Sequence, residues 1–254
     1  MKVAAIALNT WRETIRDRLM IAVLLIMALA VGVALLFEAP GPGRAQAVID
    51  LGLTLTGALG TLVAIFMGTS LVHKEMDRRT LYVVLAKPIS RFEFLLGKYL
   101  GLMAALTVMV LAMGAGMALL MGALGHFDPR ILALAAALWM QLSLVTAIAF
   151  CFSTVTSGVL SAIYTGGLFL VGMQTQVIRE FAESEVLLNM ANFVIGQLLY
   201  CILPNFGVFD YKNAVIYGGT LPWASWAWGM LYGAFLSAAF LVMAGLAWQE
   251  RELP

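Results

Sequence analysis

Long stretches without a charged residue constrain this chain more than any other feature. The longest runs from Ile131 to Ile178, 48 residues without Asp, Glu, Lys or Arg. A membrane-crossing helix needs about 20 apolar residues at ~1.5 Å each, so this run is long enough for two crossings. Only 11% of all residues are charged, whereas a soluble domain carries about 25%. The chain is therefore predicted to be an all-α polytopic membrane protein.

The uncharged runs and the breaks between them predict six transmembrane helices in a single domain, residues 1–254. The polar stretch from Ser153 to Gly158 is where the longest run folds back on itself. The predicted spans are residues 19–37, 51–73, 99–125, 131–152, 158–178 and 225–248.

Lys and Arg gather on one side of these spans. Eleven of the 15 flank the side that would hold both termini, and four flank the opposite side. Cytoplasmic loops of membrane proteins are enriched in these two residues. We therefore expect both termini to lie in the cytoplasm.

The first 18 residues have an amphipathic pattern. Leu8, Trp11 and Ile15 recur at helical spacing, while Arg12 and Arg16 occupy other positions. A helix at a membrane surface buries its apolar face and directs cations toward anionic headgroups. The pattern predicts an interfacial helix that contacts membrane lipid on the cytoplasmic side. A plain basic flank of the first span is the alternative interpretation.

The predicted cytoplasmic loop from His73 to Lys98 holds nine charges in 26 residues. Its first part, residues 75–85, has the pattern of a short helix, and Pro88 ends it because the residue before a proline avoids the α conformation. Ser90 can then cap the next helix, with Glu93 three residues later completing a capping box. Helix, break and capped helix together predict a docking element. A loop that serves topology alone is the alternative.

The stretch between the fifth and sixth spans is predicted to be external. Residues 186–203 are apolar enough to cross, but they contain Asn189, Asn192 and Gln197, and polar side chains are costly in lipid. External re-entrant helices fit this stretch better than a further crossing. The residues that end this element are Pro204, Asn205 and Phe206.

Four uncharged polar residues are candidates for the transport pathway or an interface. Thr54 and Thr61 lie in the second span, where hydroxyl side chains also serve simple helix packing. Gln174 and Gln176 lie near the outer end of the fifth, where amides need polar partners. The predicted spans hold no Asp, Glu, Lys or Arg, which argues against proton- or sodium-driven transport.

The segment from His73 to Gly101 resembles the cytoplasmic segment of ABC-2 type transporter permeases. In that family a Glu, a downstream Thr, a Pro-hydrophobic-Ser-Arg run and a Gly-Lys pair recur. Here they fall at Glu75, Thr80, Pro88–Arg91 and Gly97–Lys98. Residues 203–210 are similar to the external element of the subgroup that includes the permease for nitrous-oxide-reductase maturation.

The resemblance implies the permease subunit of an ATP-binding cassette exporter of type V in the inner membrane. It also implies a homodimer or heterodimer of six-helix subunits, with a homodimer of this chain expected, docked on a dimeric cytoplasmic ABC ATPase that holds ATP and Mg. The charged loop would be the coupling helix that contacts the ATPase. The resemblance places at that contact Glu75, Asp77, Arg78, Arg79 and Thr80, and assigns the shape of the loop to Pro88, Ser90 and Arg91.

The chain lacks a nucleotide-binding motif. A phosphate-binding loop requires Gly-x-x-x-x-Gly-Lys-Ser/Thr, but the single Gly-Lys pair, Gly97-Lys98, is followed by Tyr99 and has Phe92 in place of the first glycine. We expect no enzymatic activity, cofactor or metal on this chain. A net charge of +1 likewise gives no footprint for nucleic acid.

A second function remains open from the sequence. The external stretch, residues 179–222, is large enough to bind an external or periplasmic partner protein. The chain would then be a scaffold that transmits force from the ATPase to that partner without moving a solute. The sequence names no transported substrate.

Overall fold

A computed structural model describes residues 2–37, 44–77, 90–123, 128–175, 177, 179–180, 200, 203–212 and 219–250 of the chain. Within those ranges the secondary structure is helical, with no β-strand, so the predicted all-α class is confirmed there. The elements are α1 (Lys2–Ile15), α2 (Arg18–Phe37), α3 (Arg44–Asp77), α5 (Arg91–Ala123), α6 (Ile131–Val155), α7 (Gly158–Met173), the 3-10 helix η2 (Phe206–Phe209) and α11 (Trp223–Glu250).

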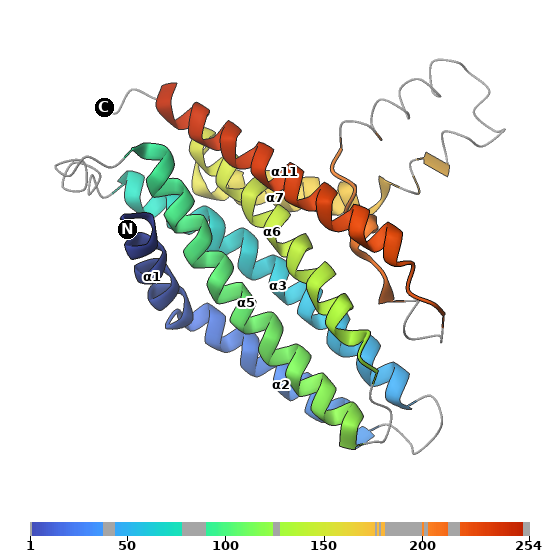
Figure 1. Cartoon of the computed structure of the whole chain (residues 1–254). Helices are drawn as coiled ribbons and strands as arrows, with labels where there is room; N and C mark the ends of the chain where they lie inside the picture. The colour runs from blue at the N-terminus through green and yellow to red at the C-terminus, as the bar shows by residue number, and fades with distance from the viewer. Residues whose placement is uncertain are drawn as a thin grey trace.

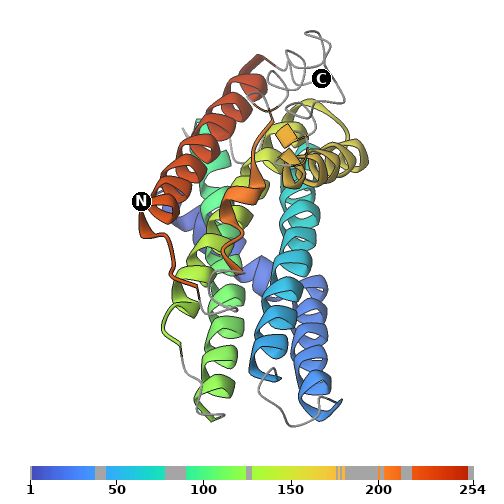
Figure 2. The same ribbon diagram turned by 90° about the vertical axis from the view of Figure 1, so that its right-hand side faces the viewer.

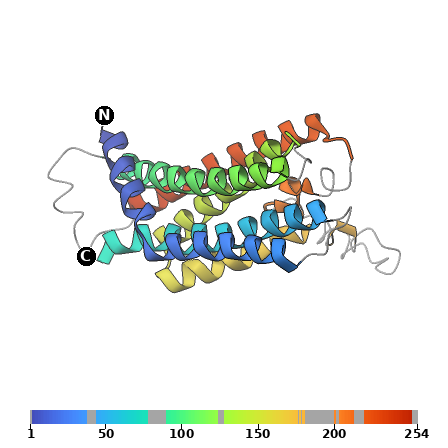
Figure 3. The same cartoon turned by 90° about the horizontal axis from the view of Figure 1, so that it is seen from below.

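Helix α6 is the centre of the bundle. It packs against α3, α5, α7 and α11, and most of its residues are buried. Helices α5 and α11 lie on one side of it, and α2, α3 and α7 lie on the other (Figures 1 and 3). The short helix α1 runs across the end of the bundle against α5.

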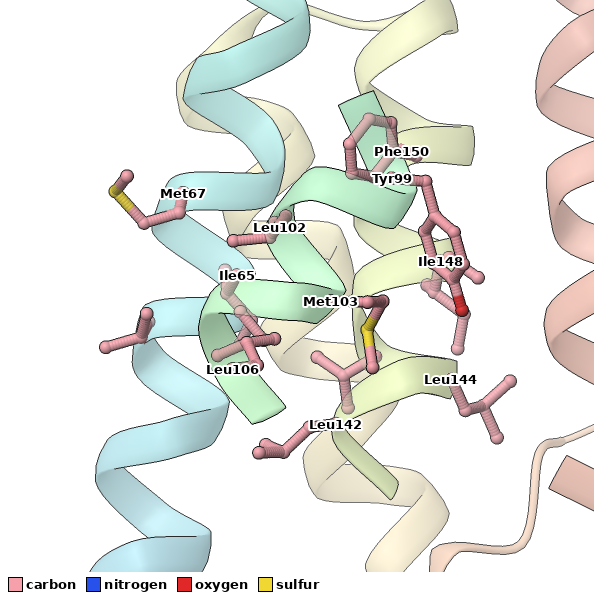
Figure 4. Packing of buried hydrophobic residues seen from close by; sticks show 14 of the residues in the cluster. Ile65, Met67, Tyr99, Leu102, Met103, Leu106, Leu142, Leu144, Ile148 and Phe150 are labelled. Atoms are coloured by element: carbon pink, nitrogen blue, oxygen red, sulfur yellow. The ribbon is translucent and has the colours of Figure 1, made fainter. Parts of the chain in front are cut away.

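Large aliphatic side chains fill the space between α3, α5 and α6. Leu102 and Leu106 of α5 are fully buried, and Ile65 of α3 and Leu142 of α6 lie in the same cluster (Figure 4). In a membrane such side chains join helices by van der Waals packing, because lipid is as apolar as leucine and adds no hydrophobic driving force. These residues join the three helices into one packed unit.

Four helices of the described ranges are long and apolar enough to cross a membrane. The stretches are Asp50–Lys74 of α3, Arg91–Leu119 of α5, Ile131–Val155 of α6 and Trp223–Gln249 of α11. Helices α2 and α7 are also apolar, but α7 has only 16 residues and ends at Met173, short of the expected 178. The multi-pass membrane class is thus supported, and the count of six crossings stays a prediction.

The predicted ends of helices agree with the observed ends where a local sequence signal marks them. The break between α6 and α7 falls at residues 156–157, inside the polar stretch that the sequence indicated. Helix α3 differs, because it continues to Asp77. Glu75 and Asp77 were predicted in a separate short helix, but nothing in the sequence between them and the span breaks the α3 backbone. The rest of that predicted coupling helix, residues 78–89, lies outside the described part of the chain.

One end of the bundle collects five elements that are distant in sequence. They are α1, the last turns of α3, the start of α5, the α6–α7 turn and the end of α11 (Figure 1). The side chain of His73 lies against Gly158 there, and Arg91 contacts Trp248. We call it the motif end, because the residues that resemble the ABC-2 segment enter and leave it. The opposite end is called the far end.

Candidate functional site

Helix α5 begins at the motif end with the capping box that the sequence predicts. The backbone N–H of Glu93 donates to the Ser90 hydroxyl at 3.2 Å, and the backbone N–H of Ser90 donates to a Glu93 carboxylate oxygen at 2.9 Å. Two of the amides that a helix start leaves without intrahelical partners are satisfied in this way. The capping box therefore fixes the point where the motif segment joins α5.

The residue after the cap connects α5 to the end of α11. The guanidinium Nη1 of Arg91 donates a hydrogen bond of 2.6 Å to the backbone carbonyl of Trp248. The indole of Trp248 is 1% exposed and stands edge-on to Phe94, with ring centroids 5.9 Å apart. Pro88 of the same motif lies outside the described residues.

Two glycines on α5 form the seat of α1. A Cβ atom on Gly97 would lie 2.9 Å from the Cβ of Ile6, and one on Gly101 would lie 2.6 Å from the Cβ of Thr10. Small residues four apart allow two helices to approach closely in membranes. Helix α1 therefore packs on α5 through a face that the amphipathic pattern did not single out.

The residues predicted at a membrane surface divide between an exposed face of α1 and the face that packs on the core. Arg12 and Arg16 are exposed, Leu8 is 47% exposed, and Trp11 is half-buried against the core. An exposed leucine beside exposed arginines fits a helix that lies in a headgroup region. The interfacial role of α1 stays a prediction.

Lys98 departs from the sequence interpretation. It was counted as a loop cation before the third span, but it lies inside α5 and is 4% exposed. Its Nζ is 3.9 Å from a carboxylate oxygen of Glu13 and 5.7 Å from the centroid of the Phe94 ring. A buried lysine requires such partners, because isolated charges are costly away from water. Lys98 thus adds a polar link between α1 and α5.

The residues assigned to ATPase contact are only partly within the described chain. The backbone of Glu75 and Asp77 forms the last turn of α3 at the motif end. The other three assigned residues, Arg78, Arg79 and Thr80, lie outside the described residues.

A groove of about 580 Å³ lies between α3 and α7 and reaches the motif end. Its walls are mostly apolar, with Ile65 and Phe66 from α3 facing Ile163 from α7. Polar groups gather toward the motif end, where the lining includes Thr69, Ser70, His73 and Lys74. The groove is therefore an amphipathic surface at the edge of the bundle.

The predicted pathway residues do not line this groove. Thr54 is exposed at the far end, and Thr61 is 3% exposed inside the packed bundle. Gln174 is exposed at the end of α7, and Gln176 lies outside the described residues. The hydroxyls that do face the groove, Thr69 and Ser70, belong to the same span but sit two turns further along it.

The far end is occupied by residues 203–212, which we call the far-end segment. It passes between α6, α7 and α11 (Figure 2). Pro204, Asn205 and Phe206 were predicted as an external element, and all three are buried within the described structure. The Phe206 ring packs on Phe169 of α7 at 5.0 Å, and the backbone N–H of Asn205 donates to the Tyr232 hydroxyl at 2.9 Å.

Two glycines on α11 make room for the far-end segment. A Cβ atom on Gly229 would lie 3.0 Å from Val208, and one on Gly233 would lie 2.8 Å from Phe209. The end of the segment reaches α3, where the ammonium of Lys212 donates to the Thr54 hydroxyl at 3.0 Å and lies 3.8 Å from Asp50. The segment therefore links three helices across the far end.

Sequence reasoning missed a buried polar network in the middle of the bundle. The Tyr99 hydroxyl is 2.6 Å from the Ser143 hydroxyl, which donates to Ser237 at 3.4 Å. Nothing in the hydropathy pattern distinguishes these residues from other polar residues in apolar runs. The glycine pair at 97 and 101 did carry a signal, since small residues four apart indicate a helix-packing face.

Comparison with known proteins adds one finding. The sequence matches the profile of the family described as "ABC-2 family transporter protein" over residues 4–249. The match includes the motif end and the far-end segment. No curated protein sequence matches this chain significantly.

Proposed function

Because the chain belongs to the ABC-2 family of transporter proteins, we propose that it is the membrane permease of an ATP-driven exporter. A separate cytoplasmic ABC ATPase hydrolyses the ATP and holds the Mg. The family match over residues 4–249 is the observation that carries this proposal. The proposal covers the permease role and names no subgroup of the family and no transported substrate.

The motif end is the side proposed to dock on the ATPase and to face the cytoplasm. Eleven of the 15 Lys and Arg residues flank that side of the predicted spans, which agrees with the enrichment of cations on cytoplasmic faces. The capping box at Ser90 supports the proposal, because it gives the charged segment before it a fixed attachment to α5.

Six crossings are proposed for each copy. Helix α2 has 20 residues, which spans about 30 Å and matches the thickness of the hydrocarbon core. Helix α7 has 16 residues and would span about 24 Å. The uncharged run of the sequence continues to residue 178.

The groove between α3 and α7 is proposed to face a second copy of this chain. Its apolar walls lie at the edge of the bundle, and exposed apolar residues continue from it along α7. Two such grooves in a homodimer enclose a path between the copies. Alternating access of that path to either side of the membrane is the proposed export mechanism.

A force-transmitting scaffold is the second candidate function. The observation that favours it is the far-end segment, which is held by α7, α11 and α3 at once. Movement of the helices would therefore reach an external partner protein bound at that end.

Capture of the tagged full chain from solubilised membranes tests the proposal. We expect an ABC ATPase to copurify and its ATP hydrolysis to depend on the permease. A variant ATPase without its phosphate-binding lysine is the control, and it should bind but not hydrolyse ATP. If the chain purifies without any ATPase, under conditions that keep two copies of the chain together, the proposal is contradicted. Hydrolysis stimulated by an external protein without cargo favours the scaffold.

A further inference from the structure

The end of α11 is attached to the start of α5 by contacts between residues that are far apart in the sequence. The guanidinium of Arg91 donates to the backbone carbonyl of Trp248 at 2.6 Å. That carbonyl belongs to the last four residues of α11, which ends at Glu250. Carbonyls there lack an intrahelical donor, and a cation also interacts favourably with that end of the helix dipole. Arg91 thus caps the C-terminal end of α11.

Close packing reinforces this cap. A Cβ atom on Gly245 of α11 would lie 2.5 Å from Cδ2 of Phe92. The indole of Trp248 is 1% exposed and contacts the Phe94 ring. These contacts fall within one turn of α5 and one turn of α11, and close packing leaves few alternative arrangements there. The start of α5 and the end of α11 are therefore in direct, closely packed contact.

The contact between α5 and α11 involves the residue at which the motif segment joins α5. Arg91 is the first residue of α5, directly after the capping residue Ser90. Under the proposed function, the segment before Ser90 contacts the ATPase. A displacement of that segment acts on α5 through the chain itself and on α11 through Arg91.

The other half of α11 carries this displacement to the far end. The hydroxyl of Tyr232 accepts from the backbone N–H of Asn205 at 2.9 Å, and the carbonyl of Ser225 accepts from the Tyr211 hydroxyl at 2.9 Å. Both acceptors lie on α11, and both donors belong to the far-end segment. A shift of α11 along its axis therefore moves the far-end segment.

We propose that Arg91 is a positioning residue that joins α11 to the ATPase-contacting segment, so that nucleotide binding at the motif end moves the far-end segment. The inference rests on the proposed function and deepens it. It assigns the transmitting role to one hydrogen bond and one packed contact, not to the α3–α7 groove.

Cysteine labelling at the far-end segment measures this movement. Asp210 is exposed, and D210C is placed in a background where Cys151 and Cys201 are replaced by serine. The complex with its ATPase is treated with a membrane-impermeant maleimide, with and without ATP and vanadate. We expect the nucleotide to change the labelling rate. The Arg91→Ala variant should reduce this change about tenfold, the factor equivalent to a charge-assisted hydrogen bond of roughly 1.4 kcal/mol.

Two further variants separate transmission from folding. Arg91→Lys keeps a cation near the carbonyl and should retain part of the response. Arg18 is the matched control, because it is likewise the first residue of a membrane helix, α2, but is exposed there. Arg18→Ala should respond as the unaltered complex does. An equal loss in R18A and R91A overturns the inference.

A reversible disulfide provides the decisive test. A Cβ atom on Gly245 would lie 3.6 Å from Cγ of Phe92, which is one bond from the Phe92 Cβ, so F92C and G245C are within the reach of a disulfide. In the R91A background the oxidised pair should restore the labelling response, and reduction should remove it again. Blocking of the response by the bond would mean that the two helix ends slide, and would overturn the inference.

The outcomes also distinguish the inference from the proposed function. No nucleotide response in the unaltered complex overturns the inference, whereas failure of an ABC ATPase to copurify with the chain overturns the proposed function. A full response in R91A overturns the inference alone and leaves the permease assignment in place.

Discussion

The hydroxyl of Tyr99 lies 2.6 Å from the hydroxyl of Ser143, at the point where α5, α6 and α11 meet. Tyr99 is 7% exposed, and its ring also stands edge-on to Phe150 at 6.0 Å. A polar group at such depth requires a partner, and here the partner belongs to the central helix. The network therefore holds three helices in register.

Tyr99→Phe removes the hydroxyl and keeps the ring. We expect a loss of about 1 kcal/mol in the free energy of unfolding, because a hydrogen bond between helices is broken and Ser143 loses its closest partner. Thermal unfolding in detergent measures the change. Tyr164→Phe is the matched control, since Tyr164 is 47% exposed. Equal stability of the two variants contradicts the prediction.

Ser90→Ala removes the side-chain cap of α5. We expect a cost of about 1 kcal/mol, the usual value for a lost N-cap, and faster hydrogen exchange at the amides of the first turn. Ser90→Asp should restore protection, because a carboxylate also accepts from these amides. Ser157→Ala is the control, because Ser157 precedes α7 without a side-chain capping bond. Equally faster exchange in both alanine variants would show that the capping box does not specifically protect the first turn of α5.

Gly101→Ala should displace α1 from its seat. The new Cβ would lie 2.5 Å from the Ala7 carbonyl oxygen, so one helix must shift. Overpacking of this kind costs about 1–3 kcal/mol. Gly116→Ala is on the same helix with open space around the new methyl group, and it should be neutral or slightly stabilising because alanine favours helix. Thermal unfolding and the protease sensitivity of α1 are measured for the Gly101 and Gly116 variants. Equal results for the two variants would contradict the close packing of α1 on Gly101.

Stability should depend on pH through Asp128 at the far end. Hydrogen bonds from Arg130, whose guanidinium Nε lies 2.9 Å from one carboxylate oxygen, hold the pKa of Asp128 below its usual range. A carboxylate with a lowered folded-state pKa stabilises the fold above the ordinary aspartate pKa of about 4. That contribution is lost as the pH falls through the lowered value.

Asp128→Asn should therefore be less stable than the unaltered chain at neutral pH, and the difference should disappear in acid. Unfolding curves recorded between neutral pH and about pH 3 give the stability of the unaltered chain and of the variant at each pH. A difference that persists unchanged below the aspartate range would assign the effect to packing instead of charge.

Glu75→Ala tests the sequence assignment of the ATPase contact. We expect normal insertion into the membrane and a fall of about tenfold in permease-dependent ATP hydrolysis, since an unpaired charge at an interface costs on the order of 1.4 kcal/mol or more. Glu180→Ala is the control, because Glu180 is exposed and belongs to the predicted external stretch. Unaltered stimulation in the Glu75 variant excludes this residue from coupling.

The sequence predicts those features that depend on local pattern. Uncharged runs located the four long apolar helices α3, α5, α6 and α11, the polar stretch at 153–158 located the turn before α7, and Ser90 with Glu93 located the start of α5. Each signal lies within a few residues of the structure that it specifies. Hydropathy and helix capping are determined by residues that are close to one another in the sequence.

Contacts between distant segments could not be predicted in the same way. Arg91 and Trp248 are 157 residues apart, and an arginine beside a membrane helix has the same pattern whether it faces water or caps another helix. Lys98 was interpreted as a loop cation for the same reason. Pro204, Asn205 and Phe206 were predicted as an external element, but the glycines that pack against the far-end segment lie on helices elsewhere in the chain.

The location of the far-end segment has a consequence for biogenesis. Its buried seat is built from α7, which precedes it in the chain, and from α11, which follows it. Residues 203–212 are synthesised before α11, so their contacts with Gly229, Gly233 and Tyr232 form only after α11 has been inserted. Docking of this segment is therefore completed late in the maturation of the protein, and shortened chains that lack α11 would leave Phe209 without its contact to Gly233.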